Sequence, residues 1–231
     1  MTLRELSSLM SAVFVIVGAV WYIYAALRGD KVKPVLASWI ILGGTMTLSF
    51  ATYWTSPKHS LVSNGCNAGS VIACLSILAT TFWIHLRDGD ALCFSKFQKW
   101  CLAFSGLIAS FWVALVWGFH GTGIVPNILT QVLMIVGYVV TAKKLWRATK
   151  NTESLFAWIL IMTGCAIAMY TGIVSSDTLV ILYGVRSTVS AATLVWLMRR
   201  IERKNRLSAQ TTPIVHCVGE CLTLLNSTSQ K

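Results

Sequence analysis

Charged residues are scarce in this sequence. Only 12% of its 231 residues are charged, whereas about a quarter would be charged in a typical soluble domain. Hydrophobic residues make up 55% of the chain, including ten tryptophans. This composition excludes a soluble globular domain and indicates an integral membrane protein.

Acids are missing from every long apolar stretch. Each Asp and Glu lies in a polar connector or near a terminus, with Asp177 at the mouth of the last apolar run. Proton-coupled transport usually requires a carboxylate or His inside the membrane, so we expect no proton coupling. Paired carboxylates and a nucleophile with a nearby base are absent as well, and we expect no enzymatic activity.

Metal-binding patterns are also lacking. The seven cysteines show no metal-type spacing, and the cluster of His216, Cys217 and Cys221 supplies too few ligands for a structural site. The sequence therefore predicts no metal and no cofactor. A retinal pigment would need a Schiff-base lysine in the last apolar run, 178–198, which contains none.

Seven apolar runs are long enough to cross a bilayer as helices, each about twenty residues. They occupy 8–27, 36–54, 67–86, 100–119, 125–142, 154–173 and 178–198. The predicted fold class is therefore an all-α integral membrane protein with seven transmembrane helices.

If the chain crosses the bilayer at these seven runs, nearly all basic residues fall on one side of the membrane. Sixteen lysines and arginines lie at one end of the spans, Arg4 and Lys58 lie at the other, and Arg186 lies within a span. Positive connectors mark the cytoplasmic side. The sequence predicts an amino terminus outside and a carboxyl terminus in the cytoplasm. The net charge of +11 is thus assigned to topology, and no nucleic-acid partner is expected.

The chain repeats itself. An offset of 119 aligns Gly18 with Gly137 and Trp39 with Trp158, and an offset of 113 aligns Trp83 with Trp196. Two like-oriented three-helix units joined by an inverting fourth helix, 3+1+3, would produce this pattern. The predicted units are the first bundle 1–90, the linker helix 91–122, the second bundle 123–200 and a disordered cytoplasmic tail 201–231.

The segments "LRGDKVKPVLASWII" and "WRATKNTESLFAWIL" carry a family resemblance. They resemble the SWEET/PQ-loop transporter superfamily and the nicotinamide riboside transporters that share its architecture. They are most similar to small bacterial seven-helix relatives with no assigned substrate, which implies a bacterial inner (plasma) membrane. The resemblance covers about 8–200 and implies a transport function; the Pro-Gln dipeptide of the PQ-loop proteins is absent, so it implies no substrate.

Polar residues inside the spans mark a candidate solute site. Tyr183, Arg186 and Ser190 share one helical face, and a charge inside a span normally faces a cavity or a partner. Gln131 has a similar depth on the fifth span, one turn below Asn127, so Gln131 and Arg186 are expected to meet.

Trp39 and Trp158 complete the candidate substrate-binding set. Two interpretations are open for both: they anchor the chain at the cytoplasmic interface, or they line a pocket. Structural roles for Arg186 and Gln131 are open in the same way.

The predicted function is a facilitator that carries a small polar solute by alternating access between the two units. The partners are then a small-molecule solute and the lipid bilayer, and the oligomeric state is undecided. A non-transporting membrane adaptor and a ligand receptor are the alternatives.

Overall fold

The computed structural model describes residues 2–29, 32–54, 65–89, 94–118 and 124–228. Side chains are described over the same ranges except at 54, 118, 124, 127 and 208–228. The described residues form seven α-helices, one π-helical turn and no strand: α1 (Leu3–Leu27), α2 (Leu36–Trp54), α3 (Gly65–Arg87), α4 (Lys96–Val113), η1 (Ala114–Gly118), α5 (Ile124–Arg147), α6 (Leu155–Ser175) and α7 (Thr178–Thr228).

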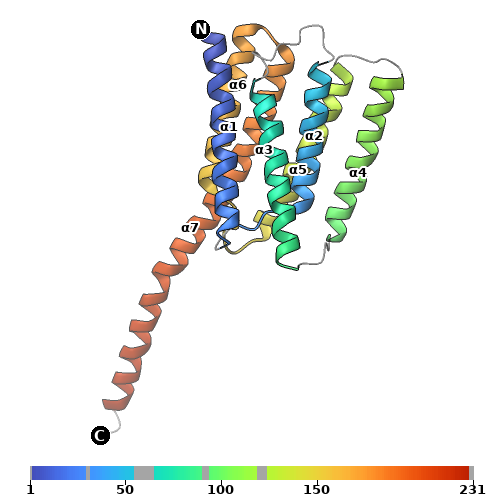
Figure 1. Ribbon diagram of the computed structural model, residues 1–231. Helices are drawn as coiled ribbons and strands as arrows, with labels where there is room; N and C mark the ends of the chain where they lie inside the picture. Colours follow the sequence, from blue (N-terminus) through green and yellow to red (C-terminus); the bar gives the residue numbers. More distant parts are fainter. Residues whose placement is uncertain (1, 30–31, 55–64, 90–93, 119–123, 229–231) are drawn as a thin grey trace.

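All seven helices are long and apolar enough to cross a membrane. The all-α class and the seven helices expected from the sequence are therefore confirmed in the described part of the chain. The helices run up and down in one bundle, so α1 begins at one end and α7 leaves from the other (Figure 1).

Polar caps fix several helix ends. Thr2 and Glu5 form a reciprocal capping box that starts α1 five residues before the predicted span at 8, and Ser95 and Gln98 start α4 in the same way. Such caps satisfy backbone N–H groups that have no partner within the helix. Ser176 closes α6 in the left-handed conformation, with φ of 52°, which allows α7 to turn back against α6.

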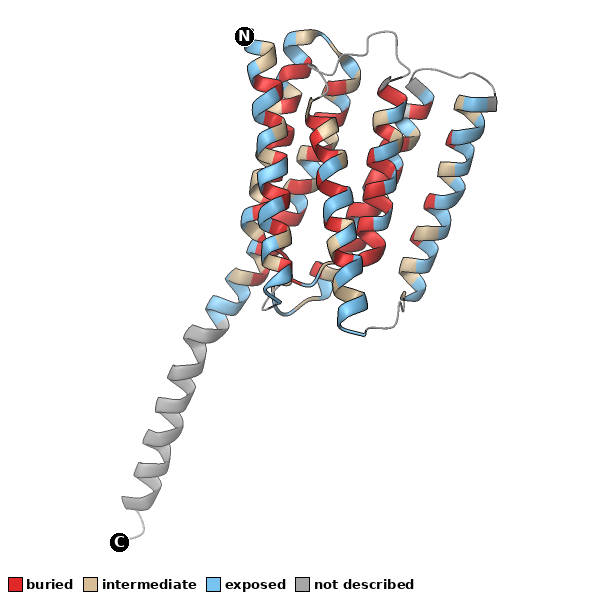
Figure 2. Cartoon of the chain, in the orientation of Figure 1, coloured by how far each residue is buried: buried red, intermediate tan, exposed pale blue. Residues whose placement is uncertain are grey.

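The helices pack in a definite order. α1 packs against α6 and α3, α2 packs against α5 and α3, and α7 packs against α6 and α5. α4 lies at the edge of the bundle beside α5 (Figure 1), and buried residues are sparse along it (Figure 2). Six helices therefore surround the interior, and α4 stands outside them.

Close packing and interhelical hydrogen bonds hold the bundle together. A Cβ added at Gly18 would lie 2.9 Å from Ile161 Cγ1, and one added at Gly137 would lie 2.8 Å from Leu42 Cδ2. Small residues allow helix backbones to approach in this way where no hydrophobic effect acts between helices. The Ser11 hydroxyl donates to the carbonyl of Gly164 at 2.7 Å and ties α1 to α6.

One end of the bundle is basic. We call it the basic end, and it carries Arg28, Arg87, Lys96, Lys143, Lys144, Arg147, Arg199 and Arg200, all at or next to helix ends or where α7 leaves the bundle. The connector segments 32–35 and 148–154 meet there, where the Lys33 N–H donates to the Thr152 carbonyl at 3.0 Å.

α7 runs on past its apolar stretch. The structure draws it as one helix from Thr178 to Thr228 (Figure 1), and the disordered tail predicted over 201–231 stays a prediction. The segment directly after the span, "RRIERKNRL", consists mostly of strong helix formers. Helical propensity therefore favours helix over 199–207.

Candidate functional site

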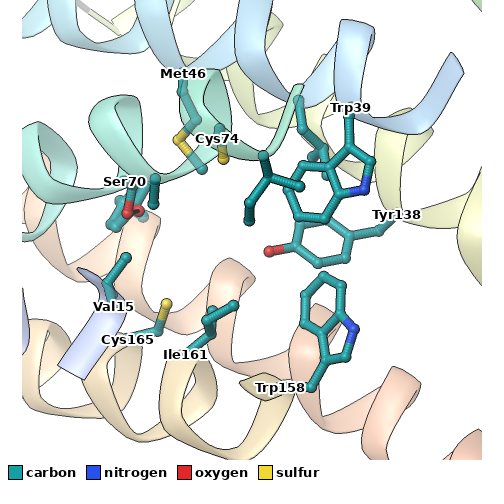
Figure 3. A pocket seen from close by; sticks show the side chains of 13 residues that line it. Val15, Trp39, Met46, Ser70, Cys74, Tyr138, Trp158, Ile161 and Cys165 are labelled. Atoms are coloured by element: carbon teal, nitrogen blue, oxygen red, sulfur yellow. Dashed lines mark hydrogen bonds between the residues drawn. The ribbon is translucent and has the colours of Figure 1, made fainter. Parts of the chain in front are cut away.

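A small cavity lies at the centre of the six packed helices. Its volume is about 30 Å³, which is room for one or two water molecules. The side chains that line it come from every long helix except α4: Val15, Trp39, Leu42, Met46, Ser70, Ala73, Cys74, Ile77, Tyr138, Trp158, Ile161, Cys165 and Tyr183 (Figure 3).

Two stacked indoles close this cavity toward the basic end. The rings of Trp39 and Trp158 lie 6.2 Å apart at an interplanar angle of 21°. Tyr22 packs edge-on against both, at 5.2 Å from Trp39 and 6.4 Å from Trp158. Tyr138 contacts Trp158 from α5 at 5.8 Å. Four aromatic rings thus form a wall between the cavity and the connectors.

The interpretation of Trp39 and Trp158 as membrane-interface anchors is wrong. Their exposed fractions are 3% and 2%, so neither indole N–H can reach a headgroup. Exposed tryptophans near the basic end are instead Trp21, Trp83, Trp100, Trp146 and Trp196. Both indoles instead line the central cavity.

Arg186 and Gln131 meet, as their depths predict. The Arg186 Nε–H donates to Gln131 Oε1 at 2.8 Å, and the guanidinium lies 5.3 Å from the centre of the Tyr183 ring. Its Nη1 and Nη2 atoms are buried and have no hydrogen-bond partner among the described residues. A buried guanidinium with two unused donor groups is poorly satisfied and is suited to a ligand that accepts hydrogen bonds.

The guanidinium lies beside the cavity rather than within its lining. Its neighbour Tyr183, whose ring centre lies 5.3 Å from the guanidinium, belongs to the cavity lining. Together with Ser190 it also lines a separate groove of about 370 Å³ between α5 and α7, whose other walls are mostly apolar. Arg186 therefore stands between the central cavity and this lateral groove.

The remaining predicted site residues divide among these places. Tyr183 lines the cavity, and its hydroxyl lies 2.8 Å from the Ser70 hydroxyl across the bundle. Ser190 lines the lateral groove and not the cavity. Asn127 lies in the first turn of α5, but its side chain falls outside the described residues.

Glu153 is a prominent residue that the sequence reasoning missed. It lies in the connector before α6, yet it is only 4% exposed. Its Oε2 accepts hydrogen bonds from the Tyr22 hydroxyl at 2.7 Å and from the Trp158 indole at 3.4 Å. Its Oε1 pairs with Lys144 Nζ at 3.2 Å, and the same ammonium donates to the Lys33 carbonyl.

These contacts form what we call the basic-end latch: Glu153, Lys144, Tyr22, Trp158 and the Lys33–Thr152 backbone bond. A buried carboxylate needs such partners because leaving it unpaired costs several kcal/mol. The latch joins α1, α5 and α6 to both connectors. A signal was available in the sequence, since Glu153 is the lone acid among the four basic residues Lys143, Lys144, Arg147 and Lys150.

The chain matches no protein-family model, no curated protein and no solved structure. A function must therefore be argued from the cavity, the latch and the residues around them.

Proposed function

We propose that the chain is a membrane facilitator, in which two like-oriented three-helix units enclose the central cavity and pass a small solute across it by alternating access. The first unit consists of α1, α2 and α3, the second of α5, α6 and α7, and α4 inverts the chain between them. The SWEET/PQ-loop resemblance of the sequence points to the same 3+1+3 arrangement.

Helix packing supports this arrangement. A two-fold axis along the bundle would exchange α1 with α5, α2 with α6 and α3 with α7. Each contact then has a counterpart: α1 on α6 corresponds to α5 on α2, and the two contacts of α3 correspond to the two contacts of α7. The glycine contacts obey the same exchange, because Gly18 meets Ile161 while Gly137 meets Leu42, and these are pairs at the offset of 119.

The cavity lining is the observation that carries the proposal. It contains four pairs of repeat-equivalent residues: Trp39 with Trp158, Leu42 with Ile161, Met46 with Cys165, and Ser70 with Tyr183. Two of these pairs are in direct contact, the stacked indoles and the bonded hydroxyls. Equivalent residues can meet in this way only near a symmetry axis, so the proposed axis passes through the cavity.

Charge supports the orientation and the location. The basic end gathers the lysines and arginines that mark a cytoplasmic face, and exposed tryptophans near that end suit a membrane interface. We therefore propose an amino terminus outside and a carboxyl terminus in the cytoplasm, and the resemblance to small bacterial proteins suggests a bacterial inner membrane.

A solute must enlarge the cavity to bind. About 30 Å³ is too small for any solute larger than water, and the basic-end latch with its indole stack closes the cytoplasmic side. Opening would separate α1 and α2 from α5 and α6 at these contacts. The two free Arg186 donors favour a solute with an anionic or hydrogen-bond-accepting group.

Transport is proposed to be uncoupled from protons. Glu153, the buried acid of the latch, is committed to Lys144, Tyr22 and Trp158, and we assign it to closure. Solute uptake should then be unchanged when a proton ionophore collapses the pH gradient across the liposome membrane.

The test begins with binding. Purified protein is screened by thermal shift against sugars, nucleosides, vitamins and amino acids, because a ligand of the folded state raises the melting temperature. The response is compared with that of Arg186→Ala and of Arg206→Ala, an exposed arginine beyond the bundle. We expect Arg186→Ala alone to lose the response.

Flux then separates the candidate functions. Uptake of the identified solute into proteoliposomes supports the facilitator, and its absence with preserved binding favours a receptor. No binding and no flux for any solute class would favour the non-transporting adaptor.

A further inference from the structure

A second groove, distinct from the central cavity, lies at the basic end between α6 and α7. Its volume is about 560 Å³. One part of its wall is apolar, formed by Met162, Ala192, Val195 and Trp196, and the other part is formed by the basic residues Arg199, Arg200, Arg203 and Lys204 with Leu207. The groove thus passes from an apolar to a cationic lining along α7.

The cationic part is not neutralised by the described acids. The ion pairs in the described part of the chain are Arg87 with Asp88 and Lys144 with Glu153, and neither involves the groove. Glu202, the acid of this turn, accepts a hydrogen bond from Asn151 at 3.2 Å and does not line the groove. Four positive side chains therefore line the groove, and the described residues of its lining include no carboxylate.

Two tryptophans indicate the level in the membrane at which this groove lies. The Arg200 guanidinium lies 4.4 Å from the Trp146 ring and 5.9 Å from the Trp196 ring. Both indoles are largely exposed, at 61% and 56%, although they lie next to the bundle. Half-exposed tryptophans beside arginines are typical of the headgroup level of a membrane, so the cationic part would lie at the phosphates and the apolar part would face acyl chains.

We propose that this α6–α7 groove is a binding site for an anionic phospholipid of the cytoplasmic leaflet. Arg199, Arg203 and Lys204 bind its headgroup phosphate, Arg200 is held beside them by the two indoles, and one acyl chain lies against Met162 and Val195. Basic pockets between membrane helices are known to select anionic headgroups. Soluble phosphates and nucleic acids would satisfy the charges but leave the apolar wall uncovered. The proposal requires that the chain spans a membrane, and it is independent of transport.

The test measures lipid retention by the full-length protein in detergent, using native mass spectrometry. Phosphatidylglycerol, phosphatidylcholine and soluble glycerol 3-phosphate are added in separate titrations. We expect wild type to retain phosphatidylglycerol in preference to phosphatidylcholine and to bind glycerol 3-phosphate negligibly.

Matched charge removals locate the site. Arg203→Gln with Lys204→Gln should weaken phosphatidylglycerol retention roughly thirtyfold, since a basic residue near an anionic headgroup contributes about a factor of five. Lys96→Gln with Lys99→Gln removes the same charge from α4 at the same end, outside the groove, and should change retention less than threefold. All four residues are on the surface, and unchanged melting temperatures without lipid will verify folding.

Two outcomes would overturn the proposal. Equal losses in both double variants would mean general attraction of lipid to a basic surface. Binding of glycerol 3-phosphate as strong as that of phosphatidylglycerol would mean a phosphate site without a lipid role.

Discussion

The two halves of the bundle share a frame and differ in chemistry. Gly18 and Gly137 make equivalent close contacts, and Trp39 and Trp158 stack on each other. The polar residues follow no such rule: at the repeat offsets, Arg186 corresponds to Ala73, Gln131 to Ala12 and Glu153 to Pro34.

This difference separates two kinds of constraint. Side chains at the contact between the halves must pack against each other. A substitution in one half therefore alters the packing of the residue that it contacts in the other half. A charged group needs only one copy, because two guanidinium groups close to one another would repel each other. The packing contacts therefore recur in both halves, whereas Arg186, Gln131 and Glu153 occur only in the second half.

The largest expected effect comes from removing the latch. Glu153→Ala leaves Lys144, the Tyr22 hydroxyl and the Trp158 indole without their acceptor, and breaking a buried pair in this way costs about 3 kcal/mol. The cavity should then open at the basic end. In a variant that retains Cys74 as its only cysteine, maleimide added on the side of the basic end should label the cavity faster.

Glu202→Ala is the matched control for the latch. It removes another acid from the basic end, and its bond is to Asn151 outside the latch. Labelling of Cys74 at the wild-type rate in Glu153→Ala would show that Glu153 does not hold the cavity closed.

The second-largest expected effect is on solute affinity, through Arg186 and Gln131. Arg186→Ala removes donors worth about 1.5–3 kcal/mol when they bind a charged or accepting partner, so affinity for the solute should fall at least tenfold. Gln131→Ala should have a smaller effect, because it frees the Arg186 Nε–H but leaves Nη1 and Nη2 in place. Isothermal titration with the solute found by thermal shift measures both, and equal affinities in wild type and Arg186→Ala would remove Arg186 from the site.

The shared frame can be probed with alanine. Gly18→Ala places a Cβ 2.9 Å from Ile161 Cγ1 and 3.1 Å from the Ala157 carbonyl, and overpacking of this kind costs about 1–3 kcal/mol. Gly137→Ala meets the movable Leu42 side chain and should cost less. Gly44→Ala meets no atom within 4 Å and serves as the control. Melting temperatures should fall in the order Gly44→Ala, Gly137→Ala, Gly18→Ala, with the last the lowest.

The smallest effect distinguishes the two stacked indoles. Phe at either position weakens the same stack, but only Trp158 donates to the carboxylate of Glu153. A bond to a charged acceptor is stronger than a neutral one, so Trp158→Phe should lower the free energy of unfolding by about 0.5–1 kcal/mol more than Trp39→Phe. Chemical denaturation in detergent measures the difference, and a reversed order would contradict the assigned latch.

Much of the fold is predictable from the sequence, because long apolar runs in a chain so poor in charge have few alternatives to membrane-length helices. Helix boundaries differ from the predicted ones where caps or long side chains extend a helix. The Thr2–Glu5 cap starts α1 early, and α5 continues to Arg147, past the predicted end at 142, because long basic side chains can remain on the last turn.

The site is only partly predictable. Equal depth was enough to pair Arg186 with Gln131. The sequence places Trp39 and Trp158 near a helix end but does not reveal that α1, α2, α5 and α6 meet there, which is what buries them. Glu153 is not predictable for the same reason. Connectors are normally solvated, and only the packing of α1, α5 and α6 surrounds this residue with Tyr22, Lys144 and Trp158.

The most direct test of the central claim asks whether the cavity opens to both sides of the membrane. Cys74, which lines the cavity and is 8% exposed, is kept as the only cysteine, and a membrane-impermeant maleimide is applied to right-side-out and to inside-out vesicles. Alternating access predicts slow labelling from both sides, with a rate that the identified solute changes. Labelling from neither side or from one side alone, with or without solute, would contradict the account.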